Sequence, residues 1–277
     1  MRQKLAHEWG THCGGGQREE NIISPAYNHS MPSSQPASRF WHLPPNAALH
    51  GSHLDTHLLF NLWLALALLT LLHILLFAAL ALRRRSHRPV HKLVLEYVPL
   101  LAFTCLFAFL AFRAQQLWAA ERYTGADLTA LQVEATGMQF AWYFRYPGVD
   151  QTFGRTSIKL VAPGEGNPLG LDPQDDHGHD DIVASQLVLP AGREVDLALR
   201  SFDVIHGFSV PEMRLKQNAV PGETVHIHFT ATQPGSYAIL CTQVCGLGHY
   251  RMQATLQVAT QAEFEAWLRA HTSGANQ

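Results

Sequence analysis

Charged residues are scarce in this sequence. Only 15% of its 277 residues are Asp, Glu, Lys or Arg, against about 25% in a typical soluble domain. The charges are also divided unevenly, because residues 1–120 carry 10 basic and 5 acidic side chains and residues 121–277 carry 10 and 17. This asymmetry indicates two halves in different surroundings, and the acidic second half suits a basic partner.

The first 57 residues lack any sustained hydrophobic period. They are rich in His, Gly, Pro, Ser and Asn, which predicts a flexible tail over residues 1–57. The start of the chain also lacks the apolar stretch of a secretory signal, so we expect no such signal there, and Met31 is a candidate for the true start. The histidines of this segment have no fixed spacing, which argues against an organised metal site.

Residues 58–82 contain no Asp, Glu, Lys or Arg. At ~1.5 Å per helical residue this run is long enough to cross a hydrocarbon core of ~30 Å. The basic segment RRRSHRPVHK follows, and then a second apolar run over residues 93–118. The positive-inside rule places the basic loop in the cytoplasm. We therefore expect a two-helix transmembrane hairpin, with both termini and the acidic half of the chain outside.

Glu96 lies near the cytoplasmic end of the second apolar run. A carboxylate in such a place is costly unless it reaches water or a partner. Two interpretations remain open: Glu96 takes up protons, or its side chain extends to the interface beside Lys92.

From residue 124 onward, short runs of Val, Ile, Leu and Phe alternate with Gly and Pro turns. Six or more strands at roughly ten-residue spacing predict an all-β sandwich or barrel over residues 124–260. The polar stretch GEGNPLGLDPQDDHGHDD interrupts the strands and is expected to be a solvated loop. Residues 261–277 begin with an amphipathic pattern that predicts a short helix and a tail.

The stretch CTQVCGLGHYRM, residues 241–252, concentrates metal-ligating side chains. Cys13 and Cys105 stand alone, whereas Cys241 and Cys245 are the only close cysteine pair. A zinc site would not ordinarily use the Met of this stretch, and a disulfide would leave its His and Met unexplained. Sulfur donors together with imidazole favour copper. A mononuclear copper site needs two histidines and one thiolate, so the second cysteine also allows a pair of coppers bridged by two sulfurs.

A second histidine must come from elsewhere, and the segment FDVIHGFSVPEM supplies His206. With DVIH and CTQVCGLGHYRM together, the chain resembles subunit II of haem–copper cytochrome c oxidases over about residues 58–260. The resemblance implies a two-helix hairpin followed by a cupredoxin-like Greek-key sandwich that carries the binuclear CuA centre. It also implies the ligands, namely two bridging thiolates, two imidazoles, a weak thioether and one backbone carbonyl: Cys241, Cys245, His206, His249, Met252 and Gln243.

The chain departs from the family pattern at two places in particular. Gln243 stands where the family usually has a Glu that helps to hold Mg²⁺ between subunits, and a neutral amide attracts a hard cation more weakly. Phe140 stands in GMQFAWYFRYP where the family has the Trp through which electrons usually enter. We expect Phe140 and Trp142 to form the patch that receives electrons. Glu96 is similar to a family Glu that guards a proton-uptake channel.

The resemblance implies an electron-accepting subunit of a respiratory oxidase in the cell inner membrane. A cytochrome c or similar donor would bind the outer domain, where Asp203 and Glu212 are candidates for the docking face or equally for a role in loop structure. Electrons would pass through CuA to the catalytic haem–copper subunit, which reduces O₂ to water together with other oxidase subunits. No O₂ site and no nucleic-acid partner are expected for this chain. Alternatives are a CuA subunit of a nitric oxide reductase and a periplasmic copper-delivery protein, whereas a copper-free quinol oxidase subunit would lack the ligands.

Overall fold

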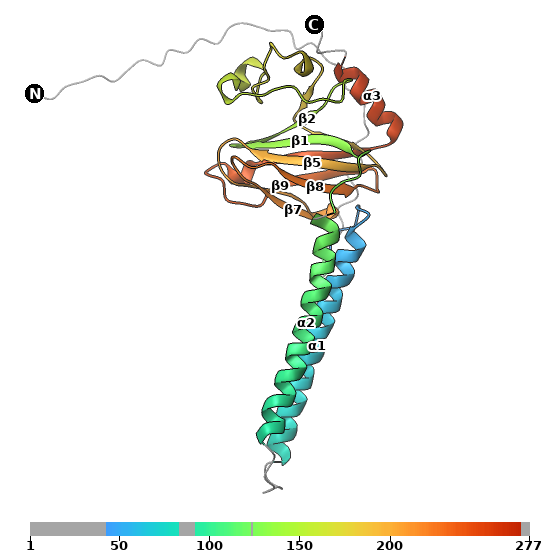
Figure 1. The fold of residues 1–277 in the computed structure, drawn as a ribbon, viewed down its shortest axis with the longest axis vertical. Coiled ribbons are helices and arrows are strands. Elements are labelled where there is room, and N and C mark those ends of the chain that lie inside the picture. Colours follow the sequence, from blue (N-terminus) through green and yellow to red (C-terminus); the bar gives the residue numbers. More distant parts are fainter. Residues whose placement is uncertain (1–42, 83–91, 123, 273–277) are drawn as a thin grey trace, which may run out of the picture. The chain divides into compact units, whose positions relative to one another are not determined.

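The computed structural model describes residues 43–82, 92–122 and 124–272. Two long helices come first, α1 (Gly51–Leu82) and α2 (Lys92–Arg122). Both are long and apolar enough to cross a membrane, and they run side by side in Figure 1. Their large apolar side chains are exposed along most of their length, as expected for helices that face lipid or other helices rather than a soluble core. The basic loop predicted between them lies outside the described residues.

The rest of the described chain is a sandwich of two mixed sheets, each with five strands (Figure 1). The first sheet has the order β3-β2-β1-β5-β8 and the second has the order β4-β10-β9-β6-β7. Strand bounds in the first sheet are β1 Leu131–Met138, β2 Ala141–Tyr146, β3 Ile182–Ala184, β5 Glu194–Ser201 and β8 Val225–Thr230. Those in the second are β4 Leu187–Pro190, β6 His206–Val210, β7 Leu215–Ala219, β9 Gly235–Cys241 and β10 Gln253–Ala259.

The chain passes repeatedly between the sheets, as in a Greek-key arrangement. β1 pairs with β5 in parallel and β4 pairs with β10 in parallel, while the other strand pairs are antiparallel. Strand β5 shows the cause of the layering, because Val195, Leu197 and Leu199 alternate along it and are fully buried between the sheets. The predicted architecture of two apolar helices followed by a β-sandwich is confirmed. Helix α3 (Gln261–Thr272) follows the last strand and packs Phe264 into the core.

The expectation of a flexible tail as far as residue 57 is wrong for its last part. Helix α1 begins at Gly51, before the apolar run, because the polar residues at its start do not interrupt backbone hydrogen bonding. The segment before it adds to the edge of the sandwich: Ala47 N–H donates to the Glu212 carbonyl, Leu49 N–H to the Thr230 carbonyl, and Thr232 N–H to the Ala47 carbonyl. Ala47 and Ala48 are buried there. Backbone pairing of this kind produces no hydrophobic period, so the sequence pattern did not predict it.

Candidate metal centre

Three strand ends bring the predicted ligands together. His206 is the first residue of β6, Cys241 is the last residue of β9, and Met252 directly precedes β10. Cys241 N–H donates to the Met252 carbonyl at 3.2 Å, and Phe208 of β6 pairs with Cys241. Neighbouring strands therefore carry the ligands to one end of the second sheet. The loop between β9 and β10 supplies the remaining donors.

The donor atoms lie within a few ångströms of one another. The two Sγ atoms of Cys241 and Cys245 are 3.9 Å apart, well beyond the ~2.05 Å of a disulfide bond. Cys245 Sγ lies 3.7 Å from His249 Nδ1 and 3.7 Å from Met252 Sδ. The Gln243 carbonyl oxygen is 3.2 Å from Cys241 Sγ. All six residues singled out in the sequence as ligands thus belong to one cluster.

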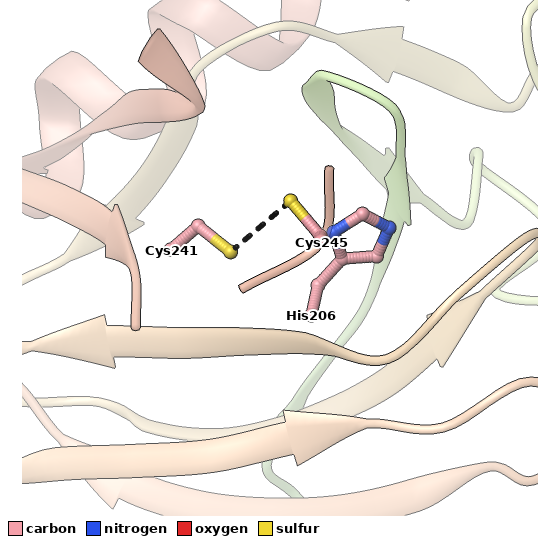
Figure 2. A group of neighbouring side chains, drawn as sticks. All are labelled: His206, Cys241 and Cys245. Carbon is pink, nitrogen blue, oxygen red and sulfur yellow. Dashed lines mark hydrogen bonds between the residues drawn. The ribbon is translucent and has the colours of Figure 1, made fainter. Parts of the chain in front are cut away.

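His206 completes the cluster from a buried position. One of its ring nitrogens and both cysteine sulfurs lie within 4.8 Å of one another, and Figure 2 shows the imidazole beside the two thiols. Nε2 lies 2.7 Å from Asp203 Oδ1. Because an ionised carboxylate only accepts, Nε2 carries the proton and Nδ1 keeps a free lone pair. Nδ1 is buried and has no hydrogen-bond partner among the described residues.

This orphaned nitrogen is the observation that tests whether a metal fits. A buried polar atom without a partner is costly, and a metal ion would satisfy the lone pair. The surrounding donors are two thiols, a second imidazole, a thioether and a carbonyl. Such sulfur-rich sets favour copper over hard cations, and the thioether distinguishes this set from usual zinc sites. The residues present therefore fit copper.

The thiols must lose their protons before they can bind a metal. Burial, reinforced by the neighbouring Cys241, raises the pKa of Cys245 to about 11. The thiol is therefore protonated at neutral pH when no metal is bound, and metal binding releases protons. Among the described residues, Cys105 is the other free cysteine, and it is exposed on α2, away from any cluster of metal-ligating groups.

The turn between β1 and β2, in the first sheet, holds the candidate metal centre through hydrogen bonds from Gln139. Gln139 donates from both its backbone and its side chain: its backbone N–H donates to Asp203 Oδ2 at 2.7 Å, and its side-chain amide donates to the Cys245 carbonyl. Gln139 thereby connects the residue that orients His206 with the loop that carries Cys245. Sequence reasoning missed Gln139 and the orienting role of Asp203, because no spacing rule relates position 139 to position 245.

Phe140 and Trp142, predicted together as the electron-receiving patch, occupy different environments. Phe140 is 39% exposed and covers Gly248, where an added Cβ would lie 2.3 Å from its ring. Trp142 is only 2% exposed, and its ring packs edge-on against His206 with centroids 5.8 Å apart. Phe140 alone can therefore be part of a surface patch, and placing Trp142 in that patch is wrong. Phe140 belongs to the turn that precedes β2, whereas Trp142 lies in β2 and shares its buried face with Phe144 and Tyr146.

The two candidates for an acidic docking face, Asp203 and Glu212, have roles within the domain. Asp203 is engaged with His206 and Gln139, and Glu212 has a buried oxygen at the turn before β7. The surface around the ligand loop also exposes several apolar side chains, namely Phe140, Val204, Ile205, Val244, Leu247 and Tyr250. The sequence did contain a signal for this patch, because the Gly-containing ligand loop carries apolar residues.

The remaining predicted positions lie far from this cluster in the sequence. Glu96 is in the first turns of α2 and is exposed there. In the polar loop, the acidic side chains bind the loop itself: Asp180 accepts from the Val149 and Asp150 amides, and Asp175 accepts from the Arg155 amide. His177 Nδ1 lies 2.6 Å from Asp150 Oδ2. These contacts explain the acidic residues of the loop without a bound cation.

Comparison with known proteins finds sequences similar to the sandwich. Residues 131–259 match the family model of the cytochrome c oxidase subunit II periplasmic domain. The alternative cytochrome c oxidase subunit 2 of Bradyrhizobium diazoefficiens is 40% identical over 141 residues, which is 50% of each chain. Cytochrome c oxidase subunit 2 of Cereibacter sphaeroides is 27% identical over 199 residues, or 69% of this chain and 64% of the relative.

A solved structure is also similar to part of the chain. It is the periplasmic domain of cytochrome oxidase subunit II from Bradyrhizobium japonicum, with 24% identity and a TM-score of 0.39, covering 52% of this chain and 94% of that one. The chain spans between a third and two thirds of the length of the curated relatives it matches.

Proposed function

We propose, from the premise that residues 131–259 belong to the family of cytochrome c oxidase subunit II periplasmic domains, that this chain is the electron-accepting subunit of a respiratory haem–copper oxidase. It would take electrons from a cytochrome c or similar donor and deliver them to a catalytic subunit that reduces O₂ to water. The observation that carries the proposal is the convergence of six donors, one of which is the buried, unpartnered Nδ1 of His206.

The ligands would divide between two copper ions. Cys241 and Cys245 would bridge them, His206 and His249 would each bind one, and Met252 and the Gln243 carbonyl would be weaker ligands. A pair of coppers bridged in this way shares one electron, so the charge change per metal is halved and bond lengths shift little. The absence of a carboxylate at Gln243 argues against an accompanying Mg²⁺ at the subunit interface.

The protein's own contribution is a fixed and partly buried ligand shell. Cys245, Met252 and His206 are buried, and Asp203 holds the His206 ring through Nε2. Trp142 packs edge-on against His206 and also edge-on against Phe208, with 5.3 Å between the centroids of the latter pair. Rigid packing of this kind limits reorganisation when the charge of the site changes. Phe140 would provide the exposed aromatic contact with the donor, surrounded by the apolar patch.

The membrane placement follows from the two apolar helices. We propose that the hairpin lies in the cell inner membrane with the copper domain and both termini on the periplasmic side, because the basic segment between the helices favours the cytoplasm. Glu96 would then lie near the cytoplasmic surface, where a proton-uptake role is open to it. The catalytic subunit would pack against the exposed apolar sides of the helices.

A CuA subunit of a nitric oxide reductase remains the second candidate function. The observation that favours it is Phe140 at the position of the usual Trp, which points to a different donor or acceptor. A periplasmic copper-delivery protein would have the same kind of donors but would release copper readily. The buried ligands and the orienting contacts of His206 favour a retained metal instead.

Electron paramagnetic resonance of the copper-loaded full chain tests the copper proposal. We expect an unpaired electron shared equally between two copper nuclei, and its loss in Cys241→Ser, while Cys105→Ser serves as the matched control and keeps it. A spectrum of a single copper nucleus would contradict the binuclear assignment. Slow exchange of the bound copper with a competing chelator would separate this function from copper delivery. Turnover of the assembled complex with O₂ and with nitric oxide would separate the two oxidoreductase functions.

A further inference from the structure

A cavity of about 290 Å³ lies between one end of the helical pair and the sandwich, well apart in sequence from the copper ligands. Residues of α1 and α2 form one side of it, and residues of β7 and β8 form the other. Its walls include Leu54, Leu117 and Trp118. Its polar lining consists entirely of basic side chains and imidazoles: His50, His57, Arg122, Arg214, Lys216 and His228. No acidic side chain of the described residues lines it.

The charges of this lining are only partly neutralised. Arg214 binds Asp55 through two hydrogen bonds, at 2.7 and 2.8 Å, so its charge is paired. The ammonium group of Lys216 has no ion pair among the described residues, and its side chain is exposed. Arg122 donates to the Lys216 carbonyl at 3.3 Å and lies over the Trp118 ring at 5.3 Å. The Lys216 ammonium therefore gives the cavity a positive charge that suits an anion.

His228 adds a buried polar atom without a partner. Its Nδ1 lies 3.1 Å from Glu194 Oε1, so Nδ1 is the donor of that contact. Its Nε2 is buried and has no hydrogen-bond partner among the described residues. A neutral ring would accept a hydrogen bond at Nε2. A ligand that complements both the positive charge of the cavity and the acceptor Nε2 would thus combine an anionic group with a hydroxyl or amine donor.

The position of the cavity along the helices indicates where that ligand comes from. About 20 helical residues cover a hydrocarbon core of ~30 Å. Counted from Leu93, the first residue of the second candidate span, this distance ends near Ala114. The cavity begins there and extends past Trp118, a residue type enriched at membrane interfaces. The lining would therefore lie at the level of the lipid headgroups, with its leucines toward the acyl chains.

We propose that this cavity binds the headgroup of an anionic phospholipid from the outer leaflet. The phosphate would lie between Arg122 and Lys216, and a headgroup hydroxyl would donate to Nε2 of His228. The glycerol backbone and the first methylenes would contact Leu54 and Leu117. The inference depends on the membrane placement of the hairpin and is independent of copper, so failure of the copper proposal would leave it standing.

Native mass spectrometry of the full chain in detergent, titrated with dioleoyl phosphatidylglycerol, tests the site. We expect the wild-type chain to retain one tightly bound lipid, Lys216→Gln to bind it on the order of tenfold more weakly, and Lys216→Arg to retain it. Lys159→Gln removes an equally exposed lysine at the loop helix η1 (Ile158–Leu160) and should leave binding unchanged. Dioleoyl phosphatidylcholine should bind more weakly than phosphatidylglycerol.

Three results would overturn the proposal. Equal affinities of Lys216→Gln and the wild type would exclude the cavity as the lipid site. Displacement of the lipid by inorganic phosphate at comparable concentration would show a general anion site rather than a headgroup site. If Lys216→Gln kept the lipid but no longer copurified with the catalytic subunit, the cavity would be a protein contact. Because Lys216 is exposed on β7, its substitution is not expected to prevent folding, and circular dichroism checks this.

Discussion

Asp203 accepts a hydrogen bond from Nε2 of His206 at 2.7 Å, and this contact determines which nitrogen of His206 is left for a metal. Burial raises the pKa of Asp203, but hydrogen bonds from the Gln139 amide, from His206 and from the Val204 amide together lower it by more. The net result is a pKa below the ordinary value, so the carboxylate remains ionised at neutral pH. It therefore acts only as an acceptor and keeps Nδ1 of His206 unprotonated.

The first prediction is that Asp203→Asn weakens copper binding about tenfold to a hundredfold, the range found for residues that orient a metal ligand. The amide can donate to Nε2 and so favour the wrong tautomer of His206. Competition with a copper chelator measures the affinity, and electron paramagnetic resonance reports any change in the remaining site. Asp196→Asn is the matched control, because Asp196 also binds a histidine, with its Oδ1 3.0 Å from Nδ1 of His226. Equal copper affinities of the two variants would contradict the orienting role.

The fold and the ligand set could be predicted from the sequence because both depend on local patterns. Apolar runs without charge indicate membrane helices, and alternation such as that of β5 indicates strands of a sandwich. Cys241, Cys245, His249 and Met252 lie within twelve residues, so their spacing alone brings them together. His206 was found because the chemistry of a copper site requires a second histidine, and its DVIH segment then agreed with the family pattern.

What the sequence did not predict depends on pairing between distant segments. Gln139 binds the carbonyl of a residue 106 positions away, and the segment around Ala47 joins the sandwich edge at Ala231. Neither contact has a period or a motif. The patch residues were misjudged for a related reason: Phe140 and Trp142 are both aromatic, but Trp142 lies in β2 and faces the core, whereas Phe140 lies in the turn before the strand.

The second prediction concerns the packing of Phe140 on the ligand loop. Gly248→Ala would place a Cβ 2.3 Å from the Phe140 ring, so the ring must move away. We expect electron uptake from reduced cytochrome c by the assembled complex to slow by about tenfold to a hundredfold, the cost of a displacement near 1 Å. The copper spectrum should be retained. Stopped-flow absorbance measures the rate.

Gly164→Ala is the control for that experiment, because an added Cβ there would meet no heavy atom within 4 Å. Phe140→Trp, in contrast, should speed the oxidation of cytochrome c if the smaller ring weakens electron uptake. Unchanged rates in both Gly248→Ala and Phe140→Trp would show that electrons enter elsewhere.

The third prediction is a pH dependence in the polar loop. A hydrogen bond to Asp150 and the attraction of its charge raise the pKa of His177 above its usual 6.5. Because the folded-state pKa is raised, the stabilising pair is complete below pH 6.5 and is lost as the pH rises through the higher, folded-state value. We expect the NMR titration midpoint of His177 to lie above 6.5 and to fall in Asp150→Asn. A midpoint that Asp150→Asn leaves unchanged would show that the pair does not form in solution.

The fourth prediction concerns the most deeply buried charge of the sandwich. Arg145 is 1% exposed and bridges two carboxylates: Nη1 donates to Glu134 at 3.1 Å and Nε donates to Asp181 at 3.0 Å. Its Nη2 also donates to Asp181 and to the Gly154 carbonyl. Removing one member of a buried ion pair leaves its partner uncompensated. Arg145→Met should therefore lower the free energy of unfolding of the sandwich by about 3–5 kcal/mol.

Arg155→Met is the control that separates the effect of burial from the effect of losing a positive charge. The Arg155 side chain is 72% exposed and lies 3.5 Å from Asp172 and from Asp175, and exposed pairs contribute at most about 1 kcal/mol. Urea denaturation of the full chain in detergent, followed by near-ultraviolet circular dichroism, compares the two variants. Because β1 carries Glu134 and β3 begins next to Asp181, the buried network joins the polar loop to the sheet. Similar losses for Arg145→Met and Arg155→Met would mean that the buried network contributes no more than a surface pair.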